Sequence, residues 1–294
     1  MPPTERRIVE IGPVSVGPGR PLALIAGCCA IESRERVLLI AQRMQAIAGE
    51  LGMPFIFKAS YDKANRNSIG SYRGPGMDEG LAILAEVRQR FQVPVLTDVH
   101  REEHVAAVAE VVDILQIPAF LVRQTDLVVA AAETGKVINL KKGQFMAPWD
   151  MANIIGKVTS TGNHRILSTE RGVSFGYNRL VSDMTALPIL RALGYPVVFD
   201  ATHSVQTPAG QGGCSGGDRT MIPTLARAAC AAGVDALFME VHDDPDQALC
   251  DGPNSMSLDE VPHLLRACQA ISRITAETTD GRRPGGCMKG AMNR

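Results

Sequence analysis

The stretch from Phe57 to Ser68 joins the end of an apolar run to a cluster of cations and small polar groups. The run stops at Lys58, and the polar segment after it supplies Lys63, Arg66 and several hydroxyl or amide side chains. A guanidinium offers phosphate a planar pair of donors, and an ammonium offers a movable point charge. The segment therefore suits a phosphorylated or carboxylated anion, although a solvated loop with ordinary surface charge explains the same composition.

Eight apolar runs in the chain each close on, or shortly before, a reactive or ionisable side chain. In chain order these are Cys29, Lys58, Asp98, Gln116, Lys141, Arg171, His203 and Glu240, with Asp251 following soon after the last. One such residue is weak evidence, because charged residues are common on surfaces. Eight of them predict a shared site at the ends of the runs.

Five basic residues form a cationic set. They are Lys58, Lys63, Lys141, Arg66 and Arg171. Cations that converge in one place repel each other unless an anion of several charges neutralises them. We therefore expect this set to bind phosphate and carboxylate groups.

A second set combines a thiol, an imidazole and two carboxylates, namely Cys29, His203, Glu240 and Asp251. Donors of these types on separate strands can hold a divalent cation such as Zn²⁺, Fe²⁺ or Mn²⁺. No CxxC pair supports this, so Cys29 as a small buried hydrophobe and His203 as an acid–base or core histidine stay open. Cys28 is expected to face away from the site, because neighbours on a strand point to opposite sides.

The elements that position these residues alternate regularly along the chain. Short runs rich in Val, Ile, Leu and Phe predict strands at Leu22–Ala26, Pro54–Phe57, Pro94–Thr97, Ile114–Ile117, Val137–Leu140, Arg165–Ser168, Pro196–Phe199 and Ala236–Met239. Apolar positions at three- and four-residue spacing predict helices at Arg36–Leu51, Glu79–Phe91, Glu102–Val112, Leu127–Gly135, Met151–Thr159, Asp183–Leu193, Met221–Ala232 and Ser257–Ile274. Eight strand–helix units in series favour an α/β fold of the (β/α)₈ barrel type, whose chemistry lies at the carboxyl ends of the strands.

The 294 residues are expected to form one barrel domain, because no linker-like stretch divides them. Apolar runs on both sides of Gly12-Pro13 predict a short leading hairpin at about residues 7–16. The barrel is expected at about residues 22–274, and a loose polar tail at about 275–294. The Gly-rich segment Gln211–Gly217 is expected to be a mobile loop, with a phosphate cradle as the alternative.

Composition argues against several classes of partner. A net charge of -1 and an aromatic content of 4% speak against a nucleic-acid-binding surface. No apolar run reaches the roughly 18 residues that a membrane span needs, and the first residues lack a signal-peptide pattern. Seven cysteines without a small-scaffold framework fit reduced thiols, so we expect a cytoplasmic protein.

Four motifs carry a resemblance to a known family. The motifs are Lys58-Ala-Ser-Tyr-Asp-Lys-Ala-Asn-Arg66, Arg171-Gly-Val-Ser-Phe-Gly-Tyr177, Asp200-Ala-Thr-His-Ser-Val-Gln206 and Cys250-Asp-Gly-Pro-Asn254, and Leu140-Lys-Lys-Gly-Gln-Phe145 adds to them. Together they resemble 3-deoxy-D-manno-octulosonate 8-phosphate synthase, over about residues 22–274. The resemblance implies a transferase that condenses phosphoenolpyruvate with D-arabinose 5-phosphate and water, releases phosphate, and serves lipopolysaccharide biosynthesis as a homotetramer.

The resemblance also implies roles for individual residues. Phosphoenolpyruvate would be held by Lys58, Lys63, Lys141 and Arg171, with Gln116 and Ala119 nearby. The sugar phosphate would be held by Asn65, Arg66 and Ser68, with Arg66 reaching from a neighbouring subunit and Asp98 contacting the sugar hydroxyls. The catalytic residues would be Lys58, Lys63, Lys141, His203, Glu240 and Asp251. Because Cys29 stands where the metal-free branch of the family has asparagine, the chain resembles the metal-dependent branch, with Cys29, His203, Glu240 and Asp251 as ligands.

Three alternatives remain. A related synthase makes 3-deoxy-arabino-heptulosonate 7-phosphate from erythrose 4-phosphate, but it has a Lys-Pro-Arg type of loop where this chain has Lys63-Ala-Asn-Arg66. A non-catalytic barrel that senses a phosphorylated ligand would need the cations and not the second set. A class II aldolase-type metal enzyme would act without releasing phosphate.

Overall fold

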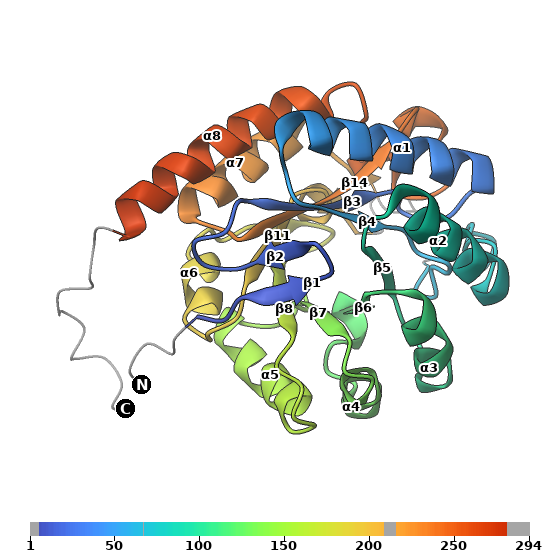
Figure 1. The fold of residues 1–294 in the computed structure, drawn as a ribbon, viewed down its shortest axis with the longest axis horizontal. Coiled ribbons are helices and arrows are strands. Elements are labelled where there is room, and N and C mark those ends of the chain that lie inside the picture. The colour runs from blue at the N-terminus through green and yellow to red at the C-terminus, as the bar shows by residue number, and fades with distance from the viewer. Residues whose placement is uncertain (1–5, 67, 209–215, 281–294) are drawn as a thin grey trace.

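The computed structural model describes residues 6–66, 68–208 and 216–280. Eight parallel strands form a closed ring, because β14 pairs with both β3 and β11 and the other strands pair in chain order (Figure 1). The barrel strands are β3 (Ala23–Gly27), β4 (Phe55–Lys58), β5 (Val95–Asp98), β6 (Ile114–Ile117), β7 (Val137–Lys141), β8 (Ile166–Glu170), β11 (Val197–Asp200) and β14 (Ala236–His242). The predicted (β/α)₈ barrel is confirmed.

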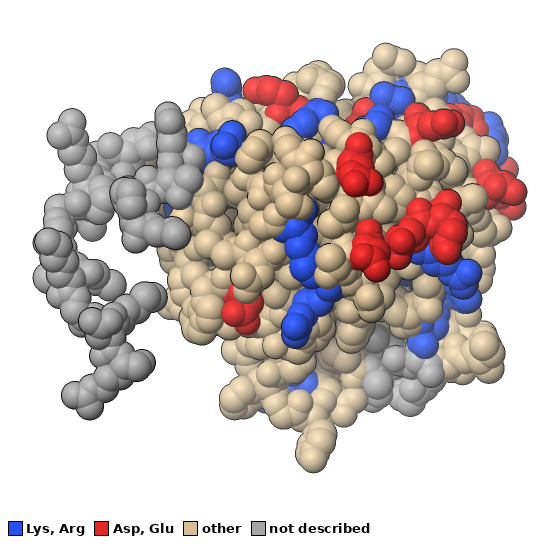
Figure 2. All heavy atoms as spheres, turned by 90° about the horizontal axis from the view of Figure 1, so that it is seen from below, with Lys and Arg blue, Asp and Glu red and all other residues tan. Residues whose placement is uncertain are grey.

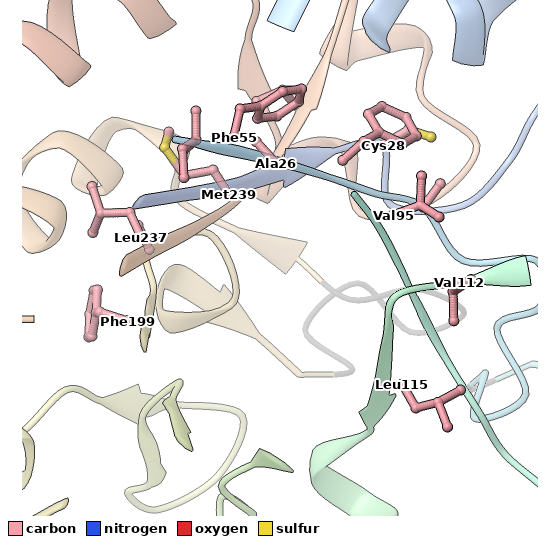
Figure 3. Close-up of a cluster of buried hydrophobic side chains, with 14 of the residues drawn as sticks. Ala26, Cys28, Phe55, Val95, Val112, Leu115, Phe199, Leu237 and Met239 are labelled. Carbon is pink, nitrogen blue, oxygen red and sulfur yellow. The ribbon is translucent and has the colours of Figure 1, made fainter. Parts of the chain in front are cut away.

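Helices surround this ring on the outside (Figure 1). They are α1 (Arg34–Leu51), α2 (Met77–Phe91), α3 (Glu102–Val111), α4 (Thr125–Glu133), α5 (Met151–Thr159), α6 (Ala186–Arg191), α7 (Ile222–Ala232) and α8 (Val261–Asp280). Ser33 caps α1 by accepting a hydrogen bond from the Arg36 amide, and Gly52 ends it in the left-handed conformation. The outward strand side chains and the inner helix faces form one large core, part of which is drawn in Figure 3.

A leading hairpin closes the amino-terminal end of the barrel, as predicted. Its strands β1 (Val9–Ile11) and β2 (Val14–Val16) pair antiparallel. Val9, Ile11, Val14 and Val16 pack in one cluster with inward-facing residues from all eight barrel strands. This apolar plug fills the bottom of the barrel and leaves the opposite end for polar side chains.

The two-residue period of a strand explains how polar residues gather at that opposite end. On β4, Ile56 belongs to the inner apolar cluster, and the next inward position is Lys58. On β14, Phe238 belongs to the same cluster, and the next inward position is Glu240. Each strand therefore changes from apolar to polar along its inner face, and the polar positions meet at the carboxyl ends.

The strands run one or two residues beyond several of the predicted ends, so that Asp98, Lys141, Glu170 and Asp200 lie within them. Helix α8 continues to Asp280, so residues 275–280 are helical. Of the Gly-rich segment, only Gly216–Gly217 lies within the described residues, as β13.

The loops contain short strands and 3₁₀ helices. The strands are β9 (Val173–Ser174), β10 (Leu180–Val181), β12 (Gln206–Thr207), β13 and β15 (Met256–Ser257), and the 3₁₀ helices are η1 (Ala119–Leu121), η2 (Pro148–Asp150), η3 (His203–Val205), η4 (Arg219–Met221), η5 (Pro245–Gln247) and η6 (Gly252–Asn254). No helix among the described residues has both the length and the apolar character to cross a bilayer. The face in Figure 2 carries basic and acidic side chains side by side.

Candidate active site

A pocket opens at the carboxyl ends of the barrel strands. Its lining holds twelve of the fourteen residues predicted to act in binding, catalysis or metal ligation: Lys58, Lys63, Asn65, Arg66, Asp98, Gln116, Ala119, Lys141, Arg171, His203, Glu240 and Asp251. Cys29 lies directly behind Asp251, with 3.6 Å between its Sγ and Asp251 Oδ2. Ser68 is half-buried and is absent from the lining. The strand ends thus bring the cationic set together with His203, Glu240 and Asp251 in one cavity, and Cys29 lies just behind it.

Lys58 joins the two sets directly. Its side chain is 1% exposed, and its Nζ donates to Glu240 Oε1 at 2.5 Å and to the Cys29 carbonyl oxygen at 2.9 Å. Lys63 Nζ lies 3.6 Å from the same Glu240 oxygen. Burial opposes ionisation, but His203, Lys58 and Lys63 hold the pKa of Glu240 below its ordinary value. Glu240 is therefore an ionised carboxylate across the whole physiological range.

Asp200, which ends β11, connects Lys141 with His203. Lys141 Nζ donates to Asp200 Oδ2, and His203 Nδ1 lies 2.8 Å from the same oxygen. Asp200 Oδ1 also accepts the backbone N–H of His203 at 2.8 Å. Although burial opposes it, His203 and Lys141 hold the pKa of Asp200 well below its usual range. Asp200 thus orients the imidazole so that Nε2 faces the pocket.

Arg171 is held at the rim by its neighbours. Its Nη2 donates to Gln206 Oε1 at 2.9 Å and to the His203 carbonyl oxygen at 3.3 Å. Glu170 Oε1 accepts the backbone N–H groups of Arg171 and Gly172, and Lys142 Nζ lies 3.5 Å from it. These contacts leave the guanidinium in a fixed direction at the pocket wall, where an anion can bind.

Asp98 and Gln116 line another part of the pocket, and each is held by a neighbouring side chain. Ser60 Oγ donates to Asp98 Oδ1, and His100 Nε2 lies 2.8 Å from Asp98 Oδ2. Asn139 Nδ2 donates to Gln116 Oε1 at 2.8 Å, which fixes that side chain. His100 therefore supports the Asp98 carboxylate.

Arg66 reaches the acidic side of the pocket from the loop after β4. Its Nη1 donates to Cys250 Sγ at 3.0 Å and lies 3.9 Å from Asp251 Oδ1. Asn65 also lines the pocket, and Asn67 lies outside the described residues. Arg66 therefore lies at the mouth of the pocket of its own chain.

The second set fits a divalent cation. His203 Nε2 lies 3.6 Å from Glu240 Oε2 and 3.7 Å from Asp251 Oδ2. Donors bound to one tetrahedral Zn²⁺ at about 2.1 Å are separated by roughly 3.4 Å, close to these values. Glu240 Oε2 is buried and has no hydrogen-bond partner among the described residues, as expected of an oxygen that binds a cation. The described residues form two such donor groups, His203–Glu240–Asp251 and Cys29–Cys250–Asp251, which share Asp251.

Comparisons with known proteins agree with this geometry. A sequence profile described as the DAHP synthetase I family matches residues 5–277. The chain belongs to the DAHP synthetase I family. Within it, the chain is 62% identical over 266 residues to a 2-dehydro-3-deoxyphosphooctonate aldolase of Trichlorobacter lovleyi, covering 90% of this chain and 98% of the relative. Proteins with the same name from Geobacter sp. strain M21 and Geobacter sulfurreducens are 60% and 59% identical over 268 residues, covering 91% of this chain and 98% of each relative. The resemblance found in the motifs is confirmed.

Sequence reasoning missed three residues of this DAHP synthetase I site. Asp200 is the first residue of one of the motifs, and it was not among the predicted site residues. It ends an apolar run, as the predicted residues do. Gln206 and Cys250 stand in two of the motifs, but their contacts are with Arg171 and Cys29, which lie on other loops of the barrel. Cys28 belongs to the outer core, as predicted, while Cys29 packs with Ala30 and Cys250.

The binding of an anion at Lys141 is expected to weaken in alkaline solution. Burial lowers the pKa of Lys141 to about 8, and Arg171 adds to this effect although Asp200 opposes it. Above that pH, Lys141 in the free protein loses its ammonium charge. The kcat/KM for an anionic substrate should therefore fall about tenfold per pH unit. The measurement is a pH–rate profile from pH 6 to 10. Lys141→Arg keeps its charge throughout and should lose this alkaline limb, whereas a wild-type profile that is flat to pH 9.5 would exclude the assignment.

Proposed function

We propose that the chain condenses phosphoenolpyruvate with D-arabinose 5-phosphate and water to give 3-deoxy-D-manno-octulosonate 8-phosphate and phosphate. The main support is the meeting of five cations with the His203–Glu240–Asp251 group in one pocket. The shared name of relatives at about 60% identity supports this acceptor over erythrose 4-phosphate. The reaction belongs to lipopolysaccharide biosynthesis.

Lys141 and Arg171 stand on one wall, and we assign phosphoenolpyruvate to them together with Lys58 and Lys63. Gln116 and Ala119 would line the same subsite. Buried cations neutralise the phosphate and the carboxylate strongly, because little water screens them. Lys58 is already paired with Glu240, so its ammonium is held in place before the substrate arrives.

We assign the sugar phosphate to Asn65, Arg66 and Ser68, and the sugar hydroxyls to Asp98. This places the aldehyde between the two walls, where C3 of phosphoenolpyruvate can reach it. Holding both reactants in register can remove about 7–11 kcal/mol of the barrier. The catalytic residues in this scheme are Lys58, Lys63, Lys141, His203, Glu240 and Asp251.

A divalent cation, Zn²⁺, Fe²⁺ or Mn²⁺, would be held by Cys29, His203, Glu240 and Asp251, and it would polarise the aldehyde or position water. The proton transfers fall to Glu240, Asp251 and His203, the titratable groups that face the same space. Asp200 keeps the imidazole oriented through its contact with Nδ1. Phosphate leaves after water adds at C2 of phosphoenolpyruvate.

We propose a homotetramer in the cytoplasm. Large exposed side chains gather beside the pocket, among them Phe120 and Phe145, which are 55% and 54% exposed, and Phe175 at 67%. A backbone hydrogen bond from Ser174 to the Gln144 carbonyl brings the loops of Phe145 and Phe175 together, and exposed apolar side chains of this size are of the kind that subunits cover. The described cysteines are free thiols, which fits a reducing compartment.

The two sugar phosphates provide the test of this function. The purified chain is incubated with phosphoenolpyruvate and either arabinose 5-phosphate or erythrose 4-phosphate, and phosphate release is followed. We expect kcat/KM for the five-carbon sugar to be at least about 100-fold higher, because the shorter sugar leaves polar groups of the pocket unpaired. Comparable rates would favour the heptulosonate reaction, and ligand binding without turnover would favour a sensor.

A further inference from the structure

Cys250 lies against the proposed metal site and has no role in the function proposed above. Its Sγ is 2.8 Å from the Sγ of Cys29, although the two residues are 221 positions apart in the chain. Both side chains are buried. Together with Asp251 they offer three ligand atoms that all lie within 4.8 Å of one another. Two sulfurs and a carboxylate oxygen are a donor set that binds thiophilic cations, and the two sulfurs would have to separate to about 3.8 Å to bind one tetrahedral Zn²⁺.

The loop that carries Cys250 is built to hold this position. Glu32, which follows Cys29 closely, accepts the Leu249 backbone N–H at 2.8 Å and lies 3.4 Å from His242 Nε2. Asp251 adopts the left-handed conformation with a φ of 52°, and Gly252 packs so tightly that an added Cβ would lie 2.4 Å from the Pro245 carbonyl oxygen. The meeting of the two thiols is therefore imposed by the surrounding structure.

Two basic side chains make contacts at this place. Arg66 Nη1 donates to Cys250 Sγ at 3.0 Å, and Lys58 Nζ donates to the Cys29 carbonyl oxygen. The other buried cysteines close to each other, Cys230 and Cys268, belong to no group of three possible ligands in the described part of the chain. The Cys29–Cys250 pair thus differs from an ordinary pair of core thiols.

We propose that Cys250 is a second sulfur ligand of the divalent cation that Cys29 and Asp251 bind. This inference rests on the metal site of the proposed function. On binding, the two thiols release two protons and form two metal–sulfur bonds, and no electron is transferred. A site with two sulfurs prefers Zn²⁺, Fe²⁺ or Co²⁺ over Mn²⁺, because thiolates are soft donors.

The sulfur count of the bound metal tests this proposal. X-ray absorption of the wild-type zinc protein should show two sulfur neighbours at about 2.3 Å. In parallel, the full chain is loaded with Co²⁺, and the sulfur-to-cobalt charge-transfer band is measured for the wild type, Cys250→Ser, Cys29→Ser and the double variant. We expect each single substitution to lower the band about twofold and the double substitution to abolish it. Cys230→Ser, which removes a buried thiol away from the pocket, should leave the band unchanged.

The outcomes separate this proposal from the function on which it rests. One sulfur neighbour on zinc, or an unchanged band in a folded Cys250→Ser protein, would overturn the Cys250 assignment and leave the rest of the metal site intact. Titration of five instead of seven thiols in metal-free, unfolded protein that was purified without reductant would assign the pair to a disulfide and also overturn it. A wild type that binds neither Zn²⁺ nor Co²⁺ would remove the metal site itself, whatever the result with arabinose 5-phosphate.

Discussion

Treatment with a strong chelator is expected to lower phosphate release from phosphoenolpyruvate and arabinose 5-phosphate by at least about 1,000-fold. A cation in such a site stabilises the transition state by several kcal/mol, and each 1.36 kcal/mol corresponds to about tenfold in rate. Without the cation, Glu240 Oε2 has no hydrogen-bond partner among the described residues, and His203 Nε2 faces two carboxylates across 3.6 and 3.7 Å. The measurement is the rate before chelation, after dialysis, and after return of Zn²⁺, Fe²⁺ or Mn²⁺.

Cys29→Asn is the matched variant for the chelator experiment. The substitution replaces the Cys29 thiolate, a strong metal ligand, by a neutral amide, so the affinity of the protein for the metal should fall. The activity that remains should respond much less to chelator than the activity of the wild type does. Metal analysis by mass spectrometry accompanies each rate. A wild-type preparation that is shown to be free of metal and is fully active would rule out the assignment of Cys29, His203, Glu240 and Asp251 as ligands of a required cation.

Lys58→Met is expected to abolish activity and to destabilise the barrel. In the metal-free protein, removal of the ammonium leaves the buried Glu240 carboxylate with Lys63, at 3.6 Å, as the one remaining lysine partner among the described residues. Breaking a buried ion pair from one side costs about 3–5 kcal/mol of unfolding free energy. Loss of a cation that faces the anionic substrate should lower kcat/KM for phosphoenolpyruvate by about 1,000-fold or more. Urea unfolding followed by circular dichroism, together with steady-state kinetics, measures the two effects.

A second substitution separates stability from catalysis. In Lys58→Met/Glu240→Gln the buried charge is neutralised, so most of the lost stability should return while activity stays absent. If the double variant is as unstable as Lys58→Met, the lost free energy of unfolding comes from packing around residue 58 and not from the unpaired carboxylate. Near-normal kinetics in Lys58→Met would show that its ammonium serves the fold only.

Much of the barrel could be predicted because its signals are local. Runs such as Val137–Leu140 and Ala236–Met239 are apolar and short, and the helices between them have their own period. The hairpin could be predicted from Gly12-Pro13 for the same reason, because turn preferences depend on a few adjacent residues. The last turns of α8 were not predicted, because the polar composition of residues 275–280 resembles that of a tail.

By itself, the order of amino acids determined the eight-fold alternation, and with it which side chains point into the barrel and at which end they gather. Lys58, Asp98, Lys141 and Glu240 could be placed in one pocket on that ground, because side chains alternate along a strand whatever it pairs with. The tertiary structure alone decided which of them touch. Lys58 contacts Glu240, Lys141 contacts Asp200, and Cys29 contacts Cys250, although the partners are 182, 59 and 221 residues apart in the chain. Such contacts depend on strand register, ring closure and the packing of loops, which no local pattern encodes.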